Sequence, residues 1–173
     1  GHTARQAEAV RRGVEQVPGA VALHLTSDEA QTRWDDLAKA DAIIFGAPTY
    51  MGSASGTFKT FIDATSEVFT SGAWRDKLAA GFTNSASRSG DKLATLLQFA
   101  ILAAQLGMHW VSLGLQPGNN TTAGSEADLN RLGFFLGAAA QSNADQGPNL
   151  APPVSDLRTA EKLGERVAHV AQQ

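Results

Sequence analysis

The segment Ala42-Ile43-Ile44-Phe45-Gly46 constrains the fold of this chain most, because it is apolar at every position over the length of one strand. A strand with one face in water alternates apolar and polar residues, whereas a strand covered on both faces is apolar throughout. Such strands occur in parallel sheets with helices on both sides. The sequence therefore predicts an α/β protein in which this strand is central.

Helical and extended segments alternate along the rest of the chain, as βαβ crossovers require. Apolar residues at helical spacing predict helices at 4–17, 32–38, 56–69, 92–106 and 156–170. Apolar or alternating runs predict strands at 21–25, 42–46, 78–82 and 110–113. Gly107 is expected to end the fourth helix in a left-handed conformation, and Ser155 or Asp156 to cap the last. We expect one domain over residues 1–173.

The segment from Leu115 to Pro153 is interrupted by glycine, asparagine and proline, and its secondary structure is the hardest to predict in the chain. Within it, Leu129–Ala140 is compatible with a helix or with an extended segment. The apolar run Leu132–Leu136 suits either the core or a subunit interface.

Composition excludes several kinds of function. The 173 residues carry a net charge of −3, which offers no basic surface for nucleic acid. No apolar run approaches the ~20 residues that cross a membrane. The chain has no cysteine, so any electron transfer must use a bound cofactor. The histidines are scattered and no metal site is predicted. We expect a cytoplasmic protein with neither nucleic acid nor a membrane as partner.

Three polar loops are rich in glycine or small hydroxyl residues: Gly1–Thr3, Pro48–Ser53 and Thr83–Gly90. In an open parallel sheet, the carboxyl ends of the strands and the N-termini of the helices meet at one edge, where ligands bind. Small residues let backbone amides approach a phosphate or a flat heterocycle. We therefore expect the three loops to form one pocket.

None of these loops identifies a ligand by itself. Gly1-His2 has a composition common at chain starts, and Thr3 is equally suited to capping a helix. Pro48–Gly52 is compatible with an ordinary strand-to-helix connection, and Thr83–Ser87 with a solvated loop. The order and spacing of the three loops carry the argument instead.

Taken in order, the runs Gly1–Arg5, Ala42–Gly52 and Lys77–Ser85 resemble the FMN-binding flavodoxin family, in particular its WrbA branch and related NAD(P)H-dependent FMN oxidoreductases. The resemblance extends to Gly114 and resumes in the closing helix, and Pro-Thr-x-x-Gly at 48–52 is its most specific element. It implies a flavodoxin-like, doubly wound parallel sheet with helices on both faces. Its first, central strand would lie upstream of Gly1, about a dozen residues earlier.

By the same resemblance, FMN is the cofactor. The residues implied to bind it are His2, Thr3, Pro48, Thr49, Tyr50, Met51, Gly52, Thr83, Asn84, Ser85, Ala86, Ser87 and Gly90. Phe69 and Leu106 are implied to line the substrate site. Leu106 departs from the family, since relatives commonly carry a histidine before the Gly-Met pair, and an aromatic residue such as Phe69 is more often simply part of the core.

The resemblance implies an NAD(P)H:quinone oxidoreductase in which the flavin carries the chemistry and no side chain is catalytic. NADH or NADPH would donate electrons to a quinone-like small molecule, in a homodimer or homotetramer. Two alternatives remain open. One is a flavodoxin-type electron carrier, although such carriers are usually more acidic. The other is a fold relative that lacks FMN and acts as a binding protein.

Overall fold

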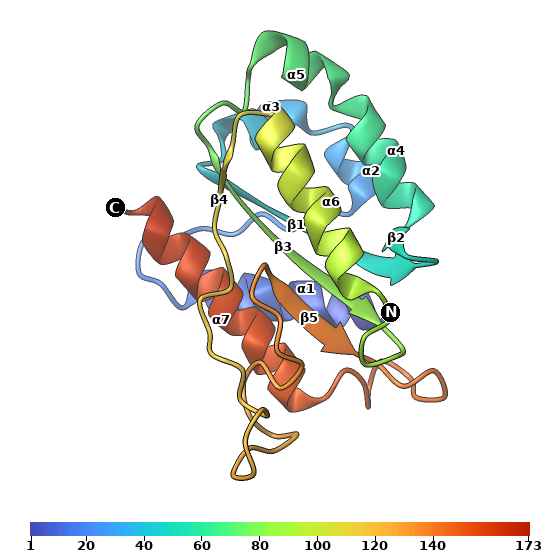
Figure 1. Cartoon of the computed structure of the whole chain (residues 1–173). Coiled ribbons are helices and arrows are strands. Elements are labelled where there is room, and N and C mark those ends of the chain that lie inside the picture. The colour runs from blue at the N-terminus through green and yellow to red at the C-terminus, as the bar shows by residue number, and fades with distance from the viewer.

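A five-stranded sheet with helices on both faces forms the protein, in a computed structural model that describes residues 1–173 (Figure 1). The strands are β1 (Ala42–Tyr50), β2 (Ser53–Ala54), β3 (Leu78–Ser85), β4 (His109–Trp110) and β5 (Ala138–Gln141). The helices are α1 (His2–Glu15), α2 (Ser27–Ala30), α3 (Trp34–Lys39), α4 (Gly56–Ala64), α5 (Ser66–Ser71), α6 (Lys92–Gln105) and α7 (Val154–Ala171). The predicted α/β class with a parallel sheet is confirmed.

The two longest strands, β1 and β3, pair in parallel from Ala42 opposite Leu78 to Pro48 opposite Asn84. The other edge of β3 is shared, with β4 pairing at its start and β5 at its end. Between β4 and β5 the chain leaves the sheet and returns. The short β2 pairs antiparallel with the end of β1.

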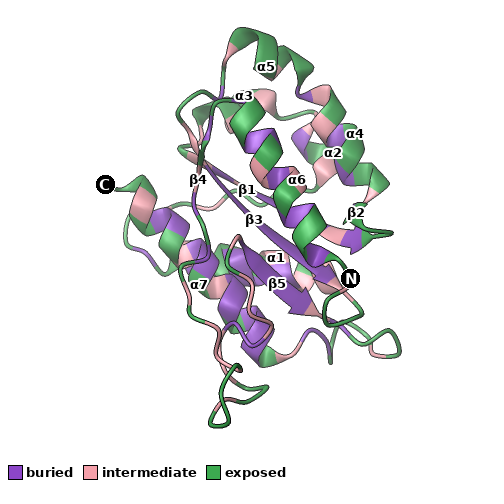
Figure 2. Ribbon diagram, in the orientation of Figure 1, coloured by how far each residue is buried: buried purple, intermediate pink, exposed green.

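Each face of the sheet has its own apolar core, and the buried side of every long helix faces the sheet (Figure 2). On one face, Phe58 of α4 and Phe99 of α6 pack together with ring centroids 4.9 Å apart and contact Phe45 of β1. On the other face, Val10 of α1 and Leu163 of α7 belong to the second core. This arrangement explains why Ala42–Gly46 is apolar throughout.

Several predicted boundaries are corrected by the structure. The strand expected at 42–46 continues through Pro48 to Tyr50, and the strand expected at 78–82 continues to Ser85. The helix expected at 56–69 is divided into α4 and α5 by Thr65. The last helix begins after Pro153 without a side-chain cap, so the prediction of Ser155 or Asp156 as its cap was wrong. Both side chains instead make tertiary contacts.

Two strand predictions also fail. Residues 21–25 belong to no strand, and Val21 is 91% exposed. Of the strand expected at 110–113, only Trp110 lies in a strand, the two-residue β4 (His109–Trp110). The rest of this edge of β3 pairs with β5. Alternation favours an extended backbone, but only a neighbouring strand makes it part of a sheet.

One edge of β1 remains open as a consequence. The carbonyl of Asp41 accepts a hydrogen bond from Leu78, so in a parallel ladder the backbone groups of Ala42, Ile44 and Gly46 point away from β3. They face a groove of about 780 Å³ between β1, α1 and residues 19–27. The amides of residues 21–25, across this groove, donate no hydrogen bond to the backbone.

The apolar run Leu132–Leu136 belongs partly to the core, because Phe134 and Leu136 pack against it. Phe135 between them is 60% exposed. No helix of the protein combines the length and the apolar character needed to span a membrane.

Candidate functional site

The ends of β1 and β3 are joined by buried hydroxyl groups. The Thr49 and Thr83 hydroxyl oxygens lie 2.7 Å apart, and Thr49 donates to the hydroxyl of Thr95 on α6 at 2.8 Å. These contacts fix the two strand ends relative to one another. The second and third predicted loops therefore leave the sheet side by side.

The end of β3 is also tied to the segment that follows β5. Ser142 donates from its hydroxyl to the Asn84 side-chain oxygen at 2.9 Å, and both residues are buried. Asn84 thus has a structural partner within the protein. Thr83, Asn84 and Ser85 lie in the strand itself, so only the residues from Ala86 onward form the loop.

The N-terminus of α1 reaches the same edge through the loop after β5. A ring nitrogen of His2 lies 2.7 Å from the Gln146 carbonyl oxygen, and Arg5 donates to the Pro148 carbonyl at 3.0 Å. Thr3, in the first turn of α1, lines the same groove as Pro48. The structure thus brings the three predicted loops to one edge of the sheet.

The turn after β1 presents apolar side chains to solvent. Met51 and Gly52 both have positive φ, 50° and 82°, as a two-residue hairpin turn between β1 and β2 requires. The Tyr50 side chain is 64% exposed and Met51 is fully exposed. An exposed aromatic ring and a thioether side by side suit contact with a flat ligand.

The loop from Ala86 to Asp91 has carbonyls that are bound and amides that are free. Its carbonyls at positions 86–89 accept hydrogen bonds from Gln141 and Lys92. None of its six amides donates to an acceptor within the protein. Gly90 and Asp91 take positive φ of 52° and 54° before α6 begins. Consecutive free amides of this kind bind anions and carbonyl oxygens of ligands.

The two residues predicted to line the substrate site lie elsewhere. Phe69 on α5 and Leu106, directly after α6, line one shallow groove between these helices. Lys92 and Leu106 lie at opposite ends of α6, whose 14 residues span about 21 Å. Within one chain, Phe69 and Leu106 are therefore separated from the three loops. The nearest histidine to Leu106 in the sequence, His109, lies on the surface with a ring nitrogen 3.3 Å from the Asp76 carboxylate.

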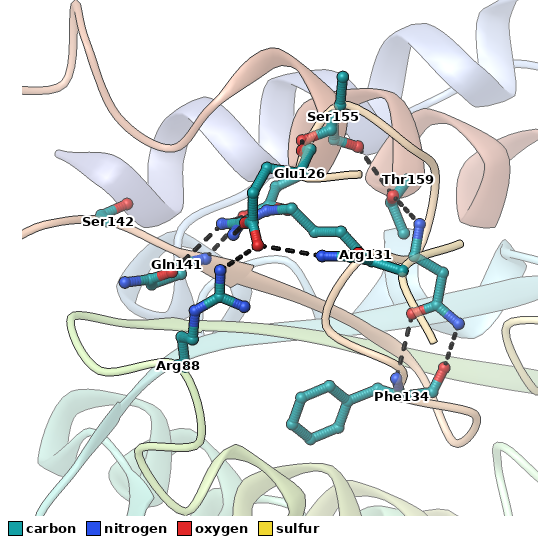
Figure 3. Close-up of polar contacts among 12 residues, drawn as sticks. Arg88, Glu126, Arg131, Phe134, Gln141, Ser142, Ser155 and Thr159 are labelled. Carbon is teal, nitrogen blue, oxygen red and sulfur yellow. Dashed lines mark hydrogen bonds and ion pairs between the residues drawn. The ribbon is translucent and has the colours of Figure 1, made fainter. Parts of the chain in front are cut away.

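A polar network supports the loop side of the site, and the sequence reasoning missed it (Figure 3). Arg131 and Asp156 in it are buried, whereas Glu126 and Arg88 are exposed. Arg131 donates twice to the Asp156 carboxylate, both at 2.8 Å, and once to Glu126 at 2.5 Å. Glu126 also pairs with Arg88 of the loop. The backbone amide of Gln141 donates to Asp156 at 2.8 Å. The network links β5, α7 and the loop after β3.

Electrostatics in this network follow from burial and pairing. Burial lowers the pKa of Lys92 to about 8, and the Asp156 carboxylate acts in the opposite direction. Hydrogen bonds from Arg88, and then from Arg131, lower the pKa of Glu126. One sequence signal was present for Lys92, because it is the only charged residue in the predominantly apolar helix α6.

The fold and this edge define a flavodoxin-like α/β protein. Residues 13–116 match the family model of NADPH-dependent FMN reductases. The chain therefore belongs to this family of flavodoxin-like proteins.

Individual relatives agree with this assignment. A protein of Pseudomonas aeruginosa called flavodoxin FldP is 45% identical over the whole chain, which covers 92% of that protein. An NAD(P)H dehydrogenase (quinone) of Geobacter sulfurreducens is 35% identical, with 99% of this chain and 92% of the relative covered. The crystal structure of a flavodoxin, WrbA-like protein from Agrobacterium tumefaciens superposes with a TM-score of 0.74 at 42% identity, covering 100% of this chain and 91% of that one.

Proposed function

We propose that the protein binds FMN at the edge formed by the three loops and transfers electrons from NADH or NADPH to quinone-like small molecules. The observation that carries this proposal is the loop at 86–91, whose six amides lack acceptors while its carbonyls are bound. A flat ligand with carbonyl oxygens and ring nitrogens supplies the missing acceptors. The residues present therefore fit FMN.

The phosphate would be held at the N-terminus of α1, by the amides of His2 and Thr3 and the Thr3 hydroxyl. Free amides and the positive end of the helix dipole favour an anion there. One side of the ring system would contact Pro48–Gly52, and the other Thr83–Ser87 with Gly90. Bound FMN would supply the redox chemistry by accepting a hydride and passing on two electrons. The side chains exclude water and orient the ring.

A flavodoxin-type electron carrier is the second candidate, and the similarity to the Pseudomonas aeruginosa flavodoxin favours it. The two candidates share the cofactor and differ in reaction with nicotinamide. Only the enzyme needs room for the nicotinamide ring against the flavin. A fold relative without FMN is the third candidate.

A visible spectrum followed by anaerobic mixing separates the three candidates. The protein is purified, saturated with FMN and freed of excess cofactor. We expect a yellow protein that NADH or NADPH bleaches, and whose colour a soluble quinone restores. A yellow protein that neither nucleotide bleaches would be a carrier. A colourless protein that takes up no FMN would exclude the enzyme and the carrier, and would support the third candidate, a binding protein without FMN.

We also propose a cytoplasmic homodimer or homotetramer. The surface of α6 supports self-association, because its exposed side chains Leu93, Leu97 and Ile101 recur every four residues. Light scattering coupled to size exclusion measures the subunit number. A monomer at all concentrations would contradict this proposal.

A further inference from the structure

Lys92 is completely buried, although it carries a charge and begins a helix. Its side chain folds back beneath the preceding loop. The ammonium nitrogen donates to the carbonyl of Ser87 at 2.5 Å and to that of Arg88 at 3.1 Å. A lysine is almost never fully buried unless its charge has specific partners. Here the partners are two backbone carbonyls of the candidate cofactor loop.

No carboxylate forms an ion pair with Lys92. The acidic group that acts on it is Asp156 of α7, and that carboxylate already accepts from Arg131 and from the Gln141 amide. The position of the ammonium is therefore determined mainly by the loop carbonyls. The ammonium in turn fixes the conformation of the loop. In a planar peptide group the carbonyl and the following amide point in opposite directions, so a carbonyl that points inward leaves that amide pointing outward.

We propose that Lys92 is a positioning residue for the cofactor site: by binding the Ser87 and Arg88 carbonyls from inside the protein, it keeps the amides of Arg88 and Ser89 available to a ligand. This inference rests on the proposed FMN site. Its physical basis is that hydrogen bonds from a charged donor are stronger than neutral ones, and that they polarise the peptide groups that accept them. The amides of Arg88 and Ser89 thereby become better donors.

The charge of Lys92 should control this positioning. The charged groups around it are Asp156 of α7, Arg131 before β5, and the pair of Arg88 and Glu126. Burial lowers the pKa of Lys92 to about 8, so the ammonium loses its proton at mildly alkaline pH. A neutral amine is a weaker donor, and the loop should loosen as the pH rises.

Trypsin digestion tests the loop without any cofactor, since Arg88 lies within it. Lys92→Met removes the charge at similar volume, Lys92→Arg keeps a charge up to about pH 12, and Lys162→Met on the surface of α7 is the control. We expect Lys92→Met to be cut after Arg88 several-fold faster at pH 7 than the control. Cutting of the wild type after Arg88, normalised to trypsin cleavage of a short unstructured peptide at the same pH, should accelerate from pH 7 to pH 9, whereas in Lys92→Arg it should not.

FMN affinity, measured by quenching of flavin fluorescence, tests the role in the site. Lys92→Met should bind FMN about tenfold more weakly than Lys162→Met at pH 7, as expected for loss of a charge-assisted hydrogen bond. The difference should shrink toward pH 9, because the wild-type ammonium is then neutral. The comparison with Lys162→Met removes any titration of FMN itself.

The two measurements distinguish failure of the positioning role from failure of the proposed FMN site. Equal affinity and equal cutting in Lys92→Met and the control would overturn the positioning role, even if the wild type binds FMN. Faster cutting in a protein that binds no FMN would retain the role in the loop and overturn the proposed function. If Lys92→Met does not fold, a pH-independent wild type in both measurements would overturn the proposal.

Discussion

Gly13 of α1 and Gly164 of α7 lie where the two helices cross, and each faces the backbone of the other helix. A methyl group added at Gly13 would overlap the Glu161 carbonyl, and one added at Gly164 would overlap that of Val10. The helices therefore pack with their backbones in contact.

We predict that Gly13→Ala or Gly164→Ala lowers the free energy of unfolding by about 2 kcal/mol or more, because the opposing backbone has to move. Gly56→Ala is the control, since a methyl group there meets nothing. Urea denaturation followed by circular dichroism measures the difference. Equal midpoints for the three variants would contradict the close crossing.

The hydroxyl cluster at the strand ends gives a second prediction. Thr83→Val should cost about 1 kcal/mol of stability, because Thr49 loses one of its two buried hydroxyl partners. FMN affinity should fall as well if the two loops need a fixed spacing. Thr121→Val, at an exposed loop position without a side-chain hydrogen bond, should change neither. Unchanged stability in Thr83→Val would show that the contact contributes nothing.

The buried pair of Arg131 and Asp156 gives a third prediction. Arg131→Met should lower the free energy of unfolding by about 3 kcal/mol, because it leaves the Asp156 carboxylate buried without its cation. Arg158→Met, one turn or less from Asp156 on the same helix, is the control. Thermal unfolding compares the two. A smaller effect in Arg131→Met than in the control would exclude a structural role for the pair.

Lys92 predicts how stability changes at alkaline pH. Its pKa is about 8 in the folded protein and 10.5 in an ordinary environment. Between these values the unfolded chain binds more protons, so the contribution of Lys92 to stability rises with pH. The free energy of unfolding of the wild type minus that of Lys92→Met should therefore increase from pH 8 to pH 10. A constant difference would contradict the lowered pKa. The advantage of the wild type over Lys92→Met in FMN affinity should instead decrease over this pH range, because the neutral amine binds the loop carbonyls more weakly.

The open edge of β1 gives a fifth prediction. We expect a further parallel strand, supplied by residues preceding Gly1, to occupy the groove between β1 and residues 21–25. In the 173-residue chain, the amides of Ala42, Ile44 and Gly46 should exchange with solvent faster than those of Ile43 and Phe45. A protein carrying the preceding residues should protect all five. Hydrogen exchange followed by NMR makes the comparison, and equal protection in both proteins would exclude such a strand.

The sequence by itself determined the helices with a clear apolar period, the α/β class and the gathering of three loops. The strand at Ala42–Gly46 could be predicted because a strand buried on both faces has no polar position. The positions of the loops Pro48–Gly52 and Thr83–Gly90 could be predicted because each follows a strand, and the carboxyl ends of parallel strands lie at one edge of the sheet. Each of these rests on local physics, in which a residue's environment follows from its near neighbours in the chain.

Only the tertiary structure decided which extended segments became strands and which charges became buried. Ala138–Gln141 has no β-branched residue, and it becomes β5 because the end of β3 offers it hydrogen bonds. Residues 21–25 alternate as a strand should, yet they have no partner. Arg131 looks like a surface charge in the sequence, and it is buried because Asp156, 25 residues further along the chain, supplies a carboxylate. Hydrogen-bond partners that are distant in sequence decided these cases, and local periodicity carries no information about them.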